Sequence, residues 1–323
     1  TFSYRCMDKQ ADYPTFDEYQ AMVYCAMANG SKGVFPFLYF DHFNSMDLRL
    51  GCDFVYETLA GIEKFLISGA STLPVNITPS DGAVDAWLKT VEGATLLIVV
   101  NIEDRKLDVT VESAGLKGIK ELYGYRSEAG ARINNGKLQV SLDPYEARLF
   151  TNPRMGADLK TVVSFRKELA TARAALKKPG NILYLPAARQ ADERRGDVEW
   201  QGTGVYSLGM EPSACFFYLN DGICDGLGFY PLKLPWSIEA LFRSFVAKFK
   251  TAKIYAANIE DLELWAWKAG EWMKVGEVKG NQAPVMVIKS AEEITTVKIK
   301  IVVKKSPRPE KRAEFYEVEL YNE

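Results

Sequence analysis

The sequence of 323 residues is poor in several features that would restrict its function. It has one histidine, His42, and five scattered cysteines without a C-x-x-C pair, which argues against a zinc site and a disulfide scaffold. Cys215 and Cys224 flank a turn and could form a bridge or remain two buried thiols, so the redox compartment stays open. No apolar run reaches the roughly 18 residues of a membrane-spanning helix, and no signal-peptide core is present.

Charge of one sign is also lacking. The formal net charge is −2, and nothing in it indicates nucleic acid or an anionic membrane surface as a partner. The local basic stretch 298–312 alternates lysine with isoleucine and valine, which predicts a strand with a solvated face. Apolar residues make up 47% and charged residues 25% of the chain, values typical of a soluble protein that at this length has two or three domains.

The stretch 15–40 organises the first part of the chain. Thr15 and Glu18 have the spacing of a capping box, so a helix is expected to begin there and to end at Asn29-Gly30. Residues 33–40 are apolar on both alternating faces, as in a strand covered on both sides. A second amphipathic helix is expected over 53–66. Thr1 is not an initiator Met, and residues 1–6 have the character of a strand end, so we expect the chain to be a piece of a longer protein.

This strand–helix–strand–helix order carries a resemblance. Tyr13-Pro14-Thr15 and the segment AMANGSKGVFPFLYF resemble the last two β/α units of the (β/α)8 barrels of glycoside hydrolases, which implies a barrel portion over residues 1–72. Catalytic groups stand at the carboxyl ends of barrel strands. Asp8, Asp41 and His42 are therefore candidates for lining a cleft, with ordinary loop polarity or a helix cap as the alternative. The paired carboxylates of glycoside hydrolysis are expected mostly upstream.

Residues 73–153 predict an antiparallel β-sandwich. Short strands of alternating polarity are expected over 84–90, 94–101, 107–112, 118–123, 137–142 and 145–150. Asn135-Gly136 is a strong signal for a hairpin turn. The segment resembles the β-domain that follows the barrel in many glycosidases, where it supports stability and interdomain contact. Residues 154–180 are expected to form a helical connector, with the helix over 155–177.

Residues 181–323 are expected to be all β. Leu219-Asn220-Asp221-Gly222, the Trp236–Phe242 segment, residues 252–275 and the terminal Glu317–Tyr321 segment together resemble a discoidin domain (coagulation factor V/VIII type C). This resemblance implies a galactose-binding-like jelly roll of eight strands. The fold class is thus multidomain, α/β followed by all-β.

The discoidin resemblance implies a structural calcium ion, with Asp221 and Glu317 at the matching positions. Calcium takes carboxylate and carbonyl oxygens; the alternative is that Asp221 caps a turn and Glu317 forms a surface ion pair. No organic cofactor is expected.

Sugar recognition uses aromatic side chains that stack on pyranose faces. Trp200, Phe229 and Tyr230 are placed in loops and are the candidates for this contact. Four further tryptophans sit in strand-like patterns, and core packing is the better explanation for most of them: Trp236, Trp265, Trp267 and Trp272.

These observations predict the C-terminal part of a carbohydrate-active protein. The resemblance implies a glycoside hydrolase parent that acts on a polysaccharide or glycoconjugate outside the cytoplasm, as a secreted, periplasmic or cell-surface protein. The chain alone is not expected to be a catalyst, and the missing barrel portion or another chain is expected to complete the barrel. A non-catalytic glycan-binding or adhesion protein is the alternative, and a scaffold that binds nothing is a third.

Overall fold

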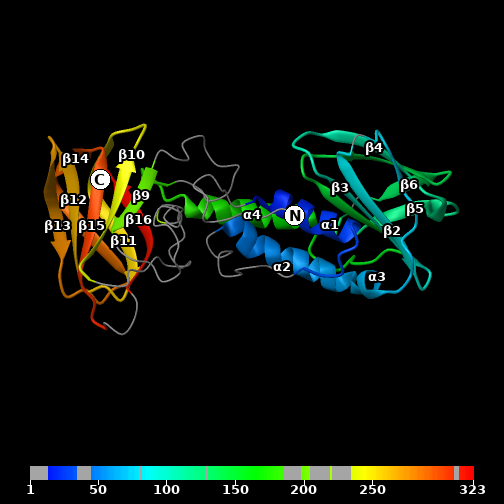
Figure 1. Ribbon diagram of the computed structural model, residues 1–323, viewed down its shortest axis with the longest axis horizontal. Coiled ribbons are helices and arrows are strands. Elements are labelled where there is room, and N and C mark those ends of the chain that lie inside the picture. Colours follow the sequence, from blue (N-terminus) through cyan, green and yellow to red (C-terminus); the bar gives the residue numbers. More distant parts are fainter. Residues whose placement is uncertain are drawn as a thin grey trace.

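The computed structural model describes residues 14–34, 45–80, 82–127, 130–184, 198–203, 219, 234–308 and 313–323. A β-sandwich lies at each end of the molecule, and the three long helices, α1 (Phe16–Ala28), α2 (Met46–Gly61) and α4 (Val162–Leu176), lie between them (Figure 1). All strand pairs among the described residues are antiparallel. The chain is therefore mainly antiparallel β.

Helix α1 (Phe16–Ala28) begins where the capping box predicts. The Thr15 hydroxyl accepts the Glu18 N–H, and the Glu18 carboxylate accepts the Thr15 N–H at 2.9 Å. The helix ends at Asn29, and Gly30 follows with a φ of 92°, a conformation that glycine adopts without strain. Both predicted ends are confirmed.

Helix α2 (Met46–Gly61) begins seven residues earlier than predicted, and a short helix α3 (Glu63–Ile67) follows it. Gly51 lies inside α2 because a side chain is already in its place: a Cβ on Gly51 would lie 2.9 Å from the Phe16 ring. Gly51 therefore marks a close contact between α1 and α2.

The first sandwich is one eight-stranded sheet that folds back on itself, with the order β1-β4-β7-β6-β5-β8-β3-β2. Every residue of β3 is buried, because one of its faces packs in the sandwich core and the other packs under the helices. The strands are β1 (Asn76–Thr78), β2 (Val84–Val91), β3 (Ala94–Asn101), β4 (Leu107–Glu112), β5 (Glu121–Gly124), β6 (Ala131–Asn134), β7 (Lys137–Leu142) and β8 (Ala147–Asn152).

The predicted strands β3, β4 and β7 are confirmed to the residue, and Asn135-Gly136 forms the β6–β7 hairpin turn with positive φ at both positions. Strands β5 and β8 begin later than predicted. Gly118 and Tyr145 have φ values of 88° and 55°, which extended strands do not accommodate. The short strands β1 and β6 have no counterpart among the predicted strands.

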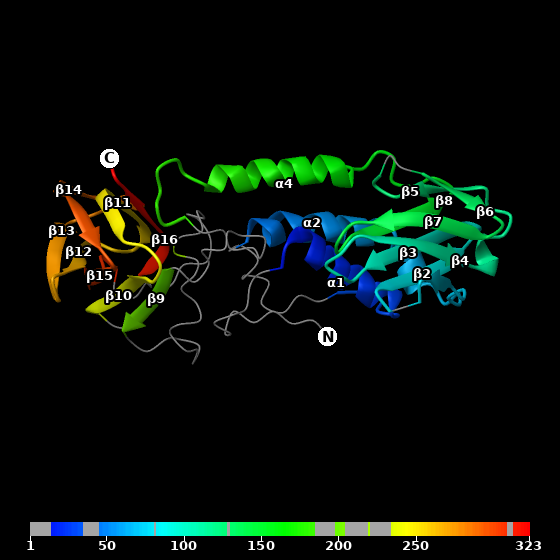
Figure 2. The same ribbon diagram turned by 90° about the horizontal axis from the view of Figure 1, so that it is seen from above.

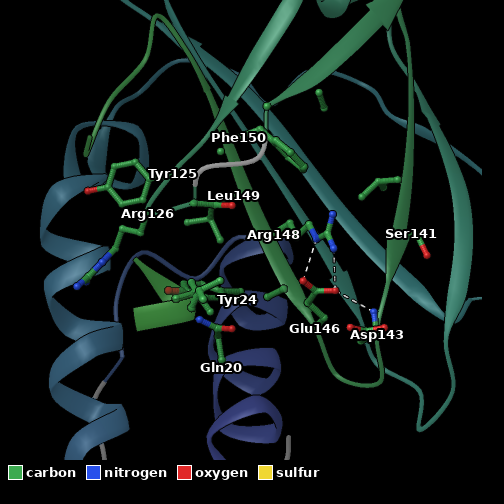
Figure 3. A pocket seen from close by; sticks show the side chains of 18 of the residues that line it. Gln20, Tyr24, Tyr125, Arg126, Ser141, Asp143, Glu146, Arg148, Leu149 and Phe150 are labelled. Atoms are coloured by element: carbon green, nitrogen blue, oxygen red, sulfur yellow. Dashed lines mark hydrogen bonds and ion pairs between the residues drawn. The ribbon is translucent and has the colours of Figure 1, made fainter. Parts of the chain in front are cut away.

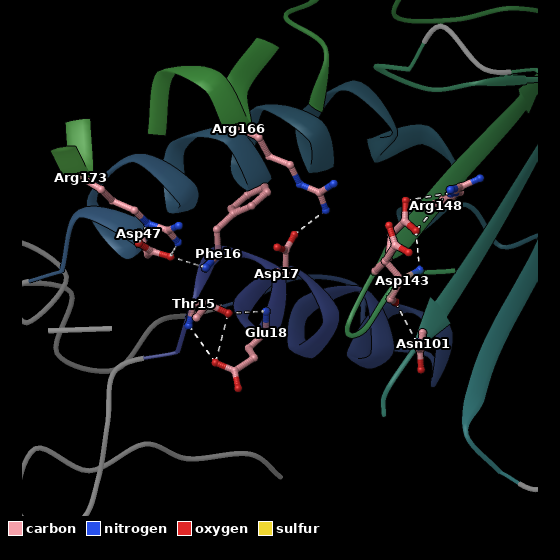
Figure 4. A network of polar contacts seen from close by, with 11 residues as sticks. Thr15, Phe16, Asp17, Glu18, Asp47, Asn101, Asp143, Arg148, Arg166 and Arg173 are labelled. Carbon is pink, nitrogen blue, oxygen red and sulfur yellow. Dashed lines mark hydrogen bonds and ion pairs between the residues drawn. The ribbon is translucent and has the colours of Figure 1, made fainter. Parts of the chain in front are cut away.

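Helix α4 (Val162–Leu176) is shorter than predicted, because Gly156 has a φ of 65° and Thr161 caps the helix by accepting the Ser164 N–H. Figure 2 shows α4 running beside α2. Two ion pairs hold it: Arg166 binds Asp17 of α1, and Arg173 binds the buried Asp47 of α2 (Figure 4). The connector is thus fixed to the helical layer along its length.

The second sandwich has a five-stranded sheet, β13-β12-β15-β10-β9, and a three-stranded sheet, β14-β11-β16. Side chains of both sheets meet in one core that includes Leu183 and Trp236. In the described part of this sandwich the strands are β9 (Val198–Thr203), β10 (Trp236–Phe242), β11 (Ala247–Ala257), β12 (Asp261–Lys268), β13 (Glu271–Val278), β14 (Val285–Thr296), β15 (Lys298–Lys305) and β16 (Glu314–Tyr321).

The barrel portion is not supported by the described residues. Of the expected segment, α1, α2 and α3 are described, while the expected strand over 33–40 lies largely outside the described residues, as do residues 1–13. Helix α1 instead packs against β2, β3 and β8, and α2 packs against α1, so that both helices share one apolar core with the first sandwich. A barrel remains a prediction about residues that the structure does not describe.

The helical layer carries ionisable groups whose pKa values predict alkaline sensitivity. Burial raises the pKa of Cys52 from 9.0 to about 11 and that of Tyr24 from 10.0 to about 12. Between pH 9 and 12 the unfolded chain therefore loses protons that the folded chain keeps, so the free energy of unfolding should fall as pH rises. Urea midpoints across this window should decrease, less steeply in Tyr24→Phe. A midpoint constant with pH would contradict this expectation.

Candidate functional site

Most of the predicted site residues lie outside the described residues. These are the cleft candidates Asp8, Asp41 and His42, the calcium candidate Asp221, and the aromatic candidates Phe229 and Tyr230. Their roles remain predictions. Two candidates can be placed, Trp200 and Glu317.

Trp200 is not in a loop, as predicted, but in strand β9, and its side chain is only 3% exposed. It belongs to the core of the second sandwich. The physical reason is the alternation of β9, which pairs Trp200 with Ala240 of β10, a residue on the buried face. A ring in this position packs against apolar side chains and offers no open face to a sugar.

Glu317 lies in strand β16 with 0% of its surface exposed. The alternative of a surface ion pair is therefore wrong. Glu319, two residues further on, is equally buried, and its Oε2 accepts hydrogen bonds from the Tyr255 and Tyr321 hydroxyls at 3.0 and 2.8 Å. Among the described residues, no group of three or more His, Cys, Asp or Glu side chains is arranged to hold a metal ion.

Three tryptophans assigned to the core lie instead on the outer face of the five-stranded sheet. In β12 the inward positions are Leu262, Leu264 and Ala266, all buried, so Trp265 and Trp267 point outward. Trp272 of β13 pairs with Trp267. All three are half-buried. We call Trp265, Trp267, Trp272, Lys298 and Lys300 the tryptophan face.

The tryptophan face is held together by ring and charge contacts. The Trp267 and Trp272 rings meet edge to face, with centroids 5.2 Å apart. Lys300 Nζ lies 4.0 Å from the Trp272 centroid and Lys298 Nζ lies 5.4 Å from the Trp267 centroid. Such cation–π contacts are worth about 0.5–1 kcal/mol at exposed sites, so the lysines orient the rings without locking them.

Glu263 connects the tryptophan face to a row of lysines. Its carboxylate accepts the Trp265 indole N–H at 3.2 Å and contacts Lys274 and Lys304 at 3.0 and 3.3 Å. Partial burial raises the pKa of Glu263, but the hydrogen bonds from the two lysines outweigh it and hold the pKa below its usual value. The carboxylate is therefore ionised at neutral pH.

This surface combines aromatic rings with hydrogen-bonding side chains, the pairing that sugar binding uses. The period-two alternation of D-L-E-L-W-A-W-K would have revealed it, since inward Leu262 and Leu264 force the tryptophans outward. The strand-like pattern around these tryptophans, taken without its alternation, favours core packing instead.

A scan of protein families finds no matching model, and a search of curated proteins finds no match. Among solved structures, several carbohydrate-binding modules are similar. The family 32 module of Streptococcus pneumoniae EndoD is 19% identical, with 39% of this chain and 96% of that chain covered and a TM-score of 0.34. The family 32 module of C. perfringens NanJ, in complex with galactose, is 16% identical over 39% and 94%, with a TM-score of 0.32.

Chitosan-binding module 2 from a chitosanase/glucanase of Paenibacillus sp. IK-5, in complex with chitotriose, is 11% identical over 39% and 96%, with a TM-score of 0.31. These scores and identities are too low to assign a function. No helix in the described part of the chain combines the length and the apolar character that a membrane crossing requires. What the described residues establish is an antiparallel β protein in which a second, two-sheet sandwich bears the tryptophan face.

Proposed function

We propose that the second sandwich is a carbohydrate-binding module and that it binds glycans on the tryptophan face. The observation that carries this proposal is the outward Trp267–Trp272 pair, whose ring centroids lie 5.2 Å apart on the outer face of the sheet. Aromatic rings present apolar faces to the C–H bonds of a pyranose, and charged side chains beside them hydrogen-bond its hydroxyls. Glu263, Lys274 and Lys300 stand in those positions.

The wider role that we propose is that of a C-terminal portion of a glycoside hydrolase or related carbohydrate-active protein that works outside the cytoplasm. The module would keep the parent protein on its polysaccharide or glycoconjugate. This part of the proposal rests on the resemblance of residues 13–40 to barrel units and on the β-sandwich that follows them. A non-catalytic adhesion protein would use the same face in the same way.

A structural calcium ion belongs to the same proposal. Glu317 fits it in one respect, since a carboxylate with 0% exposure is a strong oxygen donor in a dry site. Glu317 would be a ligand together with Asp221, and the ion would join the middle of β16 to Asp221. The ion would supply structural stability and no chemistry.

Replacing Trp272 with alanine should reduce glycan affinity about tenfold or more. Removing an aromatic side chain on which a ligand ring stacks costs roughly 1–3 kcal/mol of binding free energy. Isothermal titration with galactose and chitotriose, in parallel with a glycan array, measures this. Trp267→Ala should have a similar effect.

Met273→Ala is the matched control. Met273 is also exposed but pairs with the inward-facing Ala266, so its side chain lies on the opposite face of the sheet from Trp272. It should bind like the unaltered protein. Equal affinity of the Trp272 and Met273 variants would contradict the assignment of the tryptophan face, and no binding to any glycan, with or without chelator, would contradict the proposed function.

A further inference from the structure

A second feature with the character of a binding site lies in the other half of the molecule. A pocket of about 780 Å³ opens where the first sandwich meets helices α1, α2 and α4. Figure 3 shows Gln20 and Tyr24 of α1 on one side, Tyr125 and Arg126 beside α2, and the β7–β8 strand ends on the other. Its volume is within the range of about 300–1,000 Å³ found for small-molecule sites.

Four polar atoms of the pocket lining are buried without a hydrogen-bond partner in the described part of the chain. They are Gln20 Oε1, Tyr24 OH, Ser141 Oγ and Arg166 Nε. Gln20 is 2% and Tyr24 0% exposed. Leaving such an atom unpaired destabilises the folded state, so buried polar atoms in folded proteins are normally matched by protein, water or ligand.

Gln20 and Tyr24 are one helical turn apart on α1, with both side chains at the pocket. Burial raises the pKa of Tyr24 to about 12, while Thr58 and Gln20 lie near enough to lower it in part. Neither makes a hydrogen bond of normal geometry with the Tyr24 hydroxyl. Gln20 Oε1 and the Tyr24 hydroxyl are therefore neighbouring polar groups that can each still form a hydrogen bond.

The charges around the pocket are largely matched within the protein. Arg148 binds Glu146 at 2.8 Å, Arg166 binds Asp17 at 2.6 Å, and Lys137 binds Glu112 at 3.1 Å. Arg126 is satisfied by Glu57 and by backbone carbonyls. Four of the five cations of the lining thus have anionic partners, and the fifth, Arg132, is exposed to solvent, so the pocket has no strong demand for an anion.

The shape of the pocket depends on an aromatic ring held in glycine-sized spaces. A Cβ on Gly61 would lie 1.9 Å from the Tyr125 hydroxyl, and one on Gly156 would lie 2.7 Å from the Tyr125 ring. Tyr125 is thereby fixed in the wall, which Phe54 and Phe150 also line. The walls are thus partly aromatic. The atoms without a hydrogen-bond partner belong to neutral side chains or to Arg166, whose charge is matched by Asp17.

We propose that this pocket binds a short neutral sugar, at a site separate from the tryptophan face. Gln20 Oε1 can only accept a hydrogen bond and Arg166 Nε can only donate one. A ligand must therefore both donate and accept while carrying no charge. Sugar hydroxyls do both, and the apolar faces of the ring suit the aromatic walls.

The test uses the full chain carrying Trp267→Ala and Trp272→Ala, so that binding at the tryptophan face does not contribute. Isothermal titration with galactose, glucose, N-acetylglucosamine and chitotriose should still detect one site, and glucuronate should bind no better than glucose. Adding Gln20→Leu should weaken the sugar affinity about tenfold, which corresponds to about 1.4 kcal/mol. It should not lower the thermal midpoint of the ligand-free protein, because it removes an unsatisfied buried atom.

Gln282→Leu is the matched control, since Gln282 is an exposed glutamine outside the pocket lining, and it should leave affinity unchanged. Ser141→Ala, on the sandwich side, provides a second variant if Gln20→Leu does not fold, and should also weaken binding. The proposal is overturned if no sugar binds the double tryptophan variant, if Ser141→Ala and Gln20→Leu bind as tightly as their parent, or if Gln20→Leu destabilises the ligand-free protein. If the unaltered tryptophan face proved not to bind glycans, the results expected for the pocket would be the same.

Discussion

Replacing Arg126 with methionine should lower the free energy of unfolding of the helical layer and first sandwich by about 3 kcal/mol, the scale on which buried charged hydrogen-bond partners are lost. Arg126 is 2% exposed in the turn after β5. Its guanidinium donates to Phe54 O at 2.9 Å, Thr58 Oγ1 at 3.0 Å and Lys160 O at 2.8 Å, and it lies 3.8 Å from the Phe54 ring centroid.

The arginine therefore joins α2 to the segment that precedes α4. Methionine keeps much of the apolar stem but leaves the Lys160 carbonyl without this donor, so the variant should unfold at lower urea concentration. Hydrogen exchange at the α2 amides should increase in parallel. Glu57→Gln is the matched control: Glu57 is the ion-pair partner, but its side chain is 65% exposed, and such pairs are worth about 0–1 kcal/mol. Equal destabilisation by both variants would contradict the importance of the backbone contacts.

Asp47→Ala should cost about 2–3 kcal/mol, because it removes one partner of a largely buried ion pair together with a helix cap. Asp47 is 1% exposed and accepts the Phe16 N–H at 2.8 Å and the Arg173 Nε–H at 2.7 Å (Figure 4). The first N–H of α1 and the Arg173 guanidinium would both lose their acceptor.

A second aspartate–arginine ion pair to helix α4 provides the comparison. Asp17 binds Arg166 at 2.6 Å, but its side chain is 29% exposed, so Asp17→Ala should cost about 1 kcal/mol or less. Urea unfolding of the two single variants measures the difference. A larger loss of unfolding free energy in Asp17→Ala than in Asp47→Ala would contradict the view that burial strengthens the Asp47–Arg173 pair.

The parts of the fold that the sequence predicts well are those decided by short-range chemistry. The Thr15–Glu18 capping box, the Asn135-Gly136 turn and strand β3 each depend on residues a few positions apart, and each lies where expected. The errors come from distant partners. Gly51 belongs inside α2 because the Phe16 ring fills the space beside it.

The candidate sites show the same limit more strongly. Arginine is a residue type that usually lies on the surface. Arg126 is buried only because α2, β5 and the segment before α4 meet around it. Trp200 is expected in a loop and lies in the core, whereas Trp265 is expected in the core and lies on the outer face of its sheet. The residue type alone does not say which face of a strand turns inward. The pocket has no sequence signal, since its lining comes from elements up to 146 positions apart, Gln20 to Arg166.

Helix α4 has a consequence for binding energetics. Its 15 residues span about 22 Å, and Arg166 and Arg173 fix it to α1 and α2 on the way to the second sandwich. It is therefore a stiff spacer and not a flexible tether. With a glycan held on the tryptophan face, a second contact by the helical half becomes an intramolecular event whose effective concentration depends on a defined spacing. Avidity for a long glycan would then depend on the distance between its bound units.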